Sequence, residues 1–144
     1  MADAELIQSR RNPLVRRLRA LHQASGRREQ QRLLLEGTHL LQEVLRLGLQ
    51  PELVLATPAW QERHGALLAR LPSAVRCVLA TSEVLEAVVT TRSPDGVVAC
   101  LEPPSPSPPR QPRFVLALDR LQDPGNLGTL LRTALAAGVD TVWL

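Results

Sequence analysis

Apolar residues along the first hundred positions alternate between the spacing of helices and the short runs of strands. Helical spacing marks residues 13–21, 38–47, 59–71 and 82–89. Residues 53–56, 75–79 and 97–101 are short apolar runs typical of strands, and residues 33–35 form a shorter run. Short strands that alternate with helices predict a compact α/β domain of about a hundred residues.

Capping residues set the expected helix ends. Asn12 is expected to cap the first helix and Pro13 to open it. Thr38 is expected to cap the helix over 38–47, and Gly48 to close it. A Pro-Asp-Gly turn precedes the last run, 97–101.

A proline-rich stretch, EPPSPSPPRQP over residues 102–112, interrupts this pattern. It holds six of the chain's twelve prolines, and proline fixes φ and lacks an amide proton, so helix and central strand are excluded. We expect a domain over residues 1–102 and a semi-rigid linker over 103–112. A ligand for an SH3-type domain is the alternative for this stretch.

Residues 113–144 show one further β-α-β pattern. Residues 114–118 form an apolar run suited to a buried parallel strand, followed by a loop over 119–125. A helix is expected over 126–137, ended by Gly138, and a second strand over 140–144. One such unit cannot bury both faces of its sheet, so these residues predict the truncated beginning of a second domain.

Charge is concentrated near the start of the chain. All 17 basic residues are arginine, and eight of them fall in residues 1–32 against three acidic residues. Clustered arginine is typical of a phosphate-binding surface. A solvated helix face explains the same cluster, and charge alone does not separate the two.

Several classes of protein are disfavoured. The chain has no apolar run near the roughly 20 residues of a membrane-spanning helix, and no signal-peptide pattern opens it. Cys77 and Cys100 are expected to be buried thiols in a reducing compartment, which favours the cytoplasm. The glycines match no dinucleotide or P-loop pattern. Three scattered histidines predict no metal site, and Trp60 and Trp143 are interpreted as packing groups.

The stretch from residue 118 to 134 carries the most chemistry. Asn126 is expected to be the N-cap of a helix whose first turn contains Gly128. Arg132 lies four residues further on the same face, and its side chain leans back toward the helix start. A guanidinium over a bare helix N-terminus suits an RNA phosphate. A cap, a packing glycine and a surface arginine are the alternative interpretation.

This stretch resembles motif 1, D-P-x-N-x-G-x-x-x-R-T-A, of the SpoU (TrmH) branch of the SPOUT RNA methyltransferases. The match runs through Asp123, Pro124, Asn126, Gly128, Arg132, Thr133 and Ala134. Residues 5–102 resemble the substrate-binding domain of the same family, which has a fold like ribosomal protein L30e. The matching segments there are SRRNPLV (9–15), LEG (35–37) and SPDGV (93–97), where Gln is more usual than Asp95.

The resemblance implies an L30e-like α/β sandwich followed by the truncated first β-α-β of a SPOUT (α/β knot) methylase domain. It implies S-adenosylmethionine-dependent methylation of a ribose 2′-hydroxyl, with 23S ribosomal RNA favoured over transfer RNA. Arg132 and Asn126 would be the catalytic residues, and Asp123, Pro124 and Gly128 would shape the motif 1 loop. Motifs 2 and 3, which form the family's cofactor site, are not recognisable in this sequence. We therefore expect the chain to bind RNA, but not to bind S-adenosylmethionine or to methylate the RNA.

The residues expected to contact RNA lie in the arginine-rich segment and in the turn that follows the 33–35 run. They are Arg10, Arg11, Asn12, Arg16, Arg17, Arg27, Arg28, Glu36 and Gly37. Two other functions stay open: a non-catalytic RNA-binding protein without the knotted cofactor site, and an oligomerisation module. Family members usually dimerise through the catalytic domain, so a homodimer is expected of the full-length protein.

Overall fold

The computed structural model describes residues 6–105, 107 and 111–144. It divides into two compact units, Met1–Pro104 and Ser105–Leu144. Within the expected linker, residues 106 and 108–110 lie outside the described part of the chain. None of the described helices is both long and apolar enough to cross a membrane.

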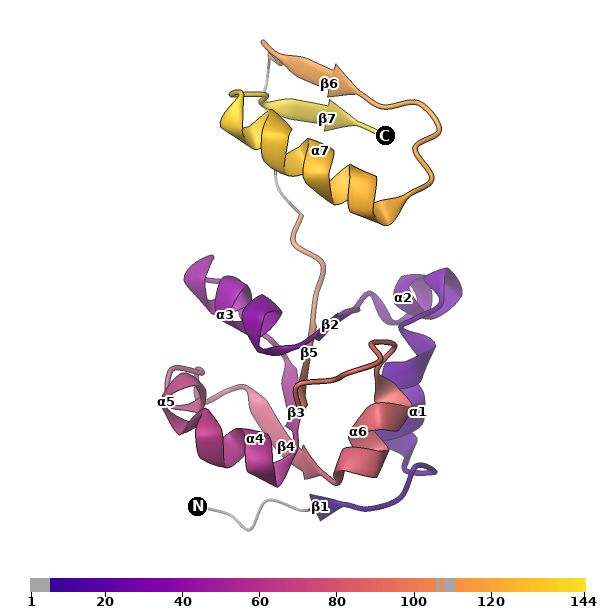
Figure 1. The fold of residues 1–144 in the computed structure, drawn as a ribbon, viewed down its shortest axis with the longest axis vertical. Helices are drawn as coiled ribbons and strands as arrows, with labels where there is room; N and C mark the ends of the chain where they lie inside the picture. Colours follow the sequence, from indigo (N-terminus) through magenta and orange to yellow (C-terminus); the bar gives the residue numbers. More distant parts are fainter. Residues whose placement is uncertain (1–5, 106, 108–110) are drawn as a thin grey trace. The chain divides into compact units, whose positions relative to one another are not determined.

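The first unit is built on a five-stranded mixed sheet (Figure 1). Its strand order is β1 (Leu6–Ile7), β4 (Arg76–Ala80), β3 (Leu53–Ala56), β5 (Val97–Leu101) and β2 (Leu33–Glu36). Strands β1, β4 and β3 are parallel, whereas β5 runs antiparallel to both of its neighbours. Every residue of β3 and β5 is buried, so the sheet must be covered on both faces.

Two groups of helices supply that cover (Figure 1). Helices α1 (Pro13–Ala20) and α6 (Ser82–Val88) pack on the face to which Leu53 and Leu55 point. Helices α3 (Thr38–Arg46), α4 (Pro58–Arg63) and α5 (Gly65–Leu68) pack on the opposite face, against Val54 and Ala56. Alternate residues of β3 thus enter two separate cores, which is the period-two arrangement of a strand. The predicted α/β sandwich is confirmed.

Most expected elements appear, and two short ones were missed. The predicted strands 53–56 and 97–101 are confirmed as β3 and β5. Strand β1 has only two residues, and helix α2 (Ala24–Gln30) has no apolar face, so hydrophobic spacing identified neither. The single helix expected over 59–71 is wrong, because the chain breaks at His64 into α4 and α5.

Trp60 is confirmed as a packing residue. Its ring is fully buried and stacks on His64, with ring centroids 4.6 Å apart. The indole Nε1–H donates to the Thr38 hydroxyl at 2.7 Å, which ties α4 to the first residue of α3. The aromatic side chain therefore joins two helices of one core layer.

Two expectations about local environment are wrong. Thr38 does not cap α3; it is the first helical residue, and the Asp95 carboxylate accepts from its backbone N–H at 2.8 Å. A side chain 57 positions away therefore caps this helix, which local sequence cannot reveal. Cys77 is exposed, whereas Cys100 is buried as expected. Among described residues, β1 pairs only with Leu79 and Ala80, which leaves the Cys77 end of β4 uncovered.

The second unit is a β-α-β arrangement. Strands β6 (Val115–Ala117) and β7 (Thr141–Trp143) are parallel, and α7 (Pro124–Ala136) connects them. The Asp140 carboxylate accepts from the backbone N–H groups of Arg113 and Phe114, at 2.9 and 3.3 Å, which joins the starts of the two strands. Trp143 is 60% exposed, so its expected packing role is wrong for the described residues.

A substitution in α2 tests how closely this helix packs. A Cβ atom added at Gly26 would lie 2.0 Å from the backbone oxygen of Ala20, so α2 must move to accommodate it. We expect Gly26→Ala to lower the free energy of unfolding by about 2 kcal/mol or more, measured by urea denaturation. Gly65→Ala in α5 is the control, because a Cβ there meets nothing within 4 Å; equal losses would contradict the packing.

Candidate functional site

One carboxylate holds two of the N-terminal arginines. The Arg17 Nη2 atom lies 2.8 Å from Glu52 Oε1, and the Arg32 Nε atom lies 2.6 Å from Glu52 Oε2. Hydrogen bonds from Arg32 and then Arg17 lower the pKa of Glu52 below its ordinary value. This bridge joins α1, the residue before β2 and the residue before β3, so Arg17 has a structural partner.

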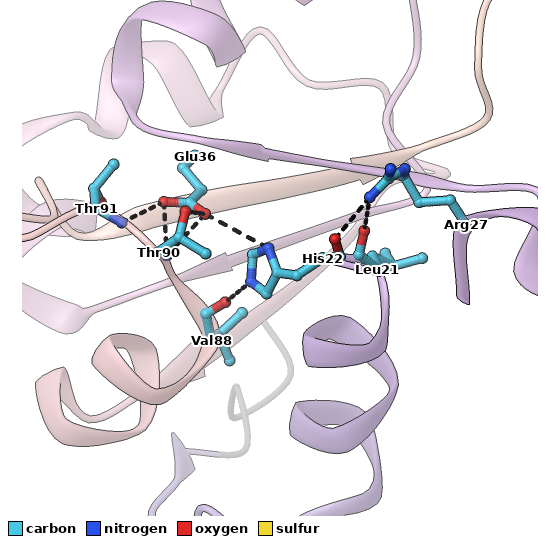
Figure 2. Close-up of polar contacts among 7 residues, drawn as sticks. All are labelled: Leu21, His22, Arg27, Glu36, Val88, Thr90 and Thr91. Atoms are coloured by element: carbon cyan, nitrogen blue, oxygen red, sulfur yellow. Dashed lines mark hydrogen bonds and ion pairs between the residues drawn. The ribbon is translucent and has the colours of Figure 1, made fainter. Parts of the chain in front are cut away.

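Two further arginines hold backbone carbonyl groups. Arg27 Nη1 donates to the carbonyl oxygens of Leu21 and His22, both at 2.9 Å, and so fixes the turn between α1 and α2 (Figure 2). Arg10 Nε donates to the carbonyl of Glu83 in α6 at 3.2 Å. Their donors therefore serve the fold before any ligand arrives.

The other predicted residues of this segment are differently placed. The Asn12 side chain accepts from Leu14 N–H at 2.8 Å and caps α1, as expected. Arg11, Arg16 and Arg28 are exposed, and their guanidinium groups have no hydrogen bond or ion pair within the described residues. The structure thus separates the predicted arginines into anchored and free side chains.

Glu36 is a brace for the loop after α6. Its carboxylate accepts from the backbone N–H and hydroxyl of Thr90, both at 2.9 Å, and from the backbone N–H of Thr91 at 3.1 Å (Figure 2). Burial would raise the pKa of Glu36, but these hydrogen bonds outweigh it and lower the pKa below its ordinary value. His22 Nδ1 lies 4.0 Å from the same carboxylate, and its Nε2 contacts the Val88 carbonyl.

Gly37 borders a groove beside this brace. Its φ of 101° belongs to the left-handed region that favours glycine. The groove has a volume of about 250 Å³ and is lined by Glu36, Gly37, Val89, Thr91, Ser93, Pro94, Asp95 and Val97. The LEG (35–37) and SPDGV (93–97) segments, far apart along the chain, therefore meet in one place.

In the second unit, Asp123 is the residue that starts α7. Its Oδ1 accepts from the Asn126 backbone N–H at 2.6 Å, and Pro124 occupies the first helical position. The expectation that Asn126 is the N-cap is therefore wrong. A Cβ at Gly125 would lie 3.1 Å from that same Asp123 oxygen, so the small residue leaves room for the cap.

Arg132 lies along the bare surface of Gly128. A Cβ at Gly128 would lie 3.7 Å from Arg132 Nη1, so the guanidinium folds back toward the helix start. Its Nη2 atom is 3.5 Å from the Thr129 hydroxyl. No hydrogen bond joins Arg132 to the Asn126 side chain among the described residues. Thr129, three residues earlier on the same face, was missed by sequence reasoning.

The helix start is not bare, which corrects the expected phosphate site. The Asp123 carboxylate already occupies it and would repel a second anion. Arg132 is exposed and has no carboxylate within ion-pair distance in the described part of the unit. This arrangement can hold an anion through the guanidinium.

Comparison with known proteins gives the class. A tRNA/rRNA methyltransferase of Synechocystis sp., itself uncharacterized, is 49% identical over 99% of this chain. The Bacillus subtilis 23S rRNA (guanosine(2553)-2′-O)-methyltransferase is 32% identical over 96% of the chain. An AdoMet-bound rRNA methyltransferase structure from Sinorhizobium meliloti, 31% identical, superposes over 96% of the chain with a TM-score of 0.73. The mixed α/β fold is shared with this structure and with the SpoU methyltransferase AviRb from Streptomyces viridochromogenes, which is 22% identical and superposes over 92% of the chain with a TM-score of 0.75.

The family follows from one further match. Residues 12–99 match the MRM3-like substrate-binding domain, which covers most of the first unit. The chain belongs to this family. It spans 53% of the length of each of the Synechocystis, Bacillus subtilis and Sinorhizobium meliloti proteins, so it corresponds to about half of them.

The brace at Glu36 predicts a pH-dependent stability. Because the pKa of Glu36 is lower in the folded chain than in the unfolded chain, its stabilisation is complete at neutral pH and is lost as pH falls through the folded pKa. We expect Glu36→Gln to lower the free energy of unfolding by about 1–2 kcal/mol at pH 7. The difference from the parent protein should vanish at acidic pH.

Urea denaturation between pH 3 and pH 7 measures this difference. Glu62→Gln on α4 is the matched control, because its exposed carboxylate has no hydrogen bond within the described residues; it should change stability by less than about 0.5 kcal/mol. A Glu36→Gln effect that is the same at every pH would exclude a charged brace.

Proposed function

We propose that this chain is the RNA-binding part, with the motif 1 helix, of an enzyme that methylates a ribose 2′-hydroxyl of 23S ribosomal RNA. The observation that carries the proposal is the match of residues 12–99 to a substrate-binding domain, followed by Arg132 folded over Gly128 on α7. The named activity of the Bacillus subtilis relative supports the substrate and the position of methylation.

Arg132 supplies the chemistry that these residues can perform. Arginine side chains stay protonated in proteins, so Arg132 acts as a fixed positive charge. It holds a phosphate of the target nucleotide and stabilises the negative charge that develops on the 2′-oxygen. The start of α7 is set by Asp123, Pro124 and Asn126. The bare surface on which the guanidinium rests is that of Gly128. S-Adenosylmethionine supplies the methyl group in this reaction.

The 144 residues and the rest of the enzyme have different roles in this proposal. The 144 residues bind RNA in the cytoplasm, and on their own they neither bind S-adenosylmethionine nor transfer a methyl group. A non-catalytic RNA-binding protein is the alternative function, supported by the match of residues 12–99 to a substrate-binding domain. In the full-length enzyme, two copies form a homodimer through the catalytic domain.

Ribose methylation in the source cells tests the proposal with the protein at its natural length. We expect disruption of the gene to remove one 2′-O-methyl group from 23S ribosomal RNA, mapped by its resistance to alkaline cleavage. The parent gene should restore it, whereas Arg132→Ala should slow methylation by about 100-fold or more, because a charge at the reacting oxygen is lost.

Arg113→Ala is the control, an exposed arginine of the same unit that should restore full methylation. An unchanged methylation pattern after disruption would favour the non-catalytic RNA-binding function. Full activity of Arg132→Ala would remove this side chain from the reaction.

A further inference from the structure

The arginines of α1 have unequal freedom to meet a ligand. This helix, PLVRRLRA, has three arginines and no acidic residue. Glu52 holds Arg17 at 2.8 Å. Arg16 and Arg19 are exposed, and neither guanidinium has a hydrogen bond or ion pair anywhere in the described residues. Two positive charges of α1 are therefore uncompensated by the fold.

Helix geometry places these two side chains together. Val15 and Leu18 are fully buried and define the inner face of α1. Arg16 and Arg19 are three residues apart, so they are neighbours on one exposed strip of the helix. Arg17 projects to another side, where it meets Glu52 and lies beside Gln30 and Arg32 around a shallow pocket.

The fold gives no reason to keep this pair of like charges. Two arginines that are neighbours on one helix face repel each other, which weakens the helix. The helix dipole favours a cation in the last turn, which accounts for Arg19 and not for Arg16 in the middle of the helix. An external anion that spans both side chains removes the repulsion.

We propose that Arg16 and Arg19 form the phosphate-contacting strip of the RNA interface, and that Arg17 and Arg27 are anchors that do not contact RNA. This assignment rests on the proposed RNA-binding function and sharpens it. It adds Arg19 to the set of RNA-contacting residues predicted from the sequence, and it removes Arg17 and Arg27 from that set. The recognised chemistry is the sugar–phosphate backbone of a folded RNA, because two exposed guanidinium groups on a helix surface bind phosphates through their charge.

Three double variants test the assignment: two of them each remove two positive charges, and the third preserves both charges. The probe is a 23S ribosomal RNA transcript, and its affinity for the 144-residue chain is measured at several KCl concentrations. Arg16→Gln with Arg19→Gln should reduce the slope of log affinity against log salt by about 2, since each lost phosphate contact removes about one. The melting temperature should stay unchanged. Arg16→Lys with Arg19→Lys keeps both charges and should keep the slope.

Arg17→Gln with Arg27→Gln is the matched control. It should lower the melting temperature, because it breaks the Glu52 bridge and frees the carbonyls of Leu21 and His22. Its salt slope, measured well below that melting temperature, should equal that of the parent chain. A slope lost in this variant, or kept in the Arg16/Arg19 variant, would overturn the assignment.

A failure of the proposed function would give results different from a failure of this assignment. If the parent chain shows no salt-dependent RNA binding at all, RNA recognition by this domain is wrong and the strip loses its ligand. If poly-glutamate competes as well as RNA of equal charge, the strip binds an acidic protein surface instead, which also contradicts the proposal.

Discussion

Burial of β3 and β5 on both faces is the constraint on which the first unit depends. Helices must cover both sides of this sheet, and their ends must then be fixed without further apolar surface. Charged side chains do this work: Glu52 joins Arg17 and Arg32, Glu36 holds Thr90 and Thr91, and Asp95 caps α3. Much of the chain's charge is therefore committed to the fold, and the uncommitted arginines are the informative ones.

In the second unit, too, a charged side chain fixes the start of a helix. The Asp123 carboxylate accepts from the Asn126 backbone N–H at the start of α7, and Gly125 and Gly128 leave space along the helix. Arg132 fills that space with a guanidinium that no carboxylate neutralises within the described residues. This positive charge over Gly128 on α7 is where we propose that an RNA ribose and phosphate approach.

The sequence predicted what depends on local spacing and missed what depends on distant partners. The runs 53–56 and 97–101 are continuous and apolar, and both became strands with those bounds. The cap of α3 could not be foreseen, because Asp95 lies 57 positions from Thr38. Similarly, the sequence could not show that Arg17 and Arg27 have partners within the fold, because these partners are Glu52 and the carbonyl groups of the α1–α2 turn. The polar helix α2 gave no periodic signal at all.

RNA recognition by the substrate-binding domain can be tested by crosslinking the natural protein to RNA in its own cells and sequencing the attached RNA. We expect reads to accumulate in one region of 23S ribosomal RNA, at a folded segment contacted by this domain. Enrichment confined to transfer RNA, or no RNA above the background of an uncrosslinked sample, would contradict it.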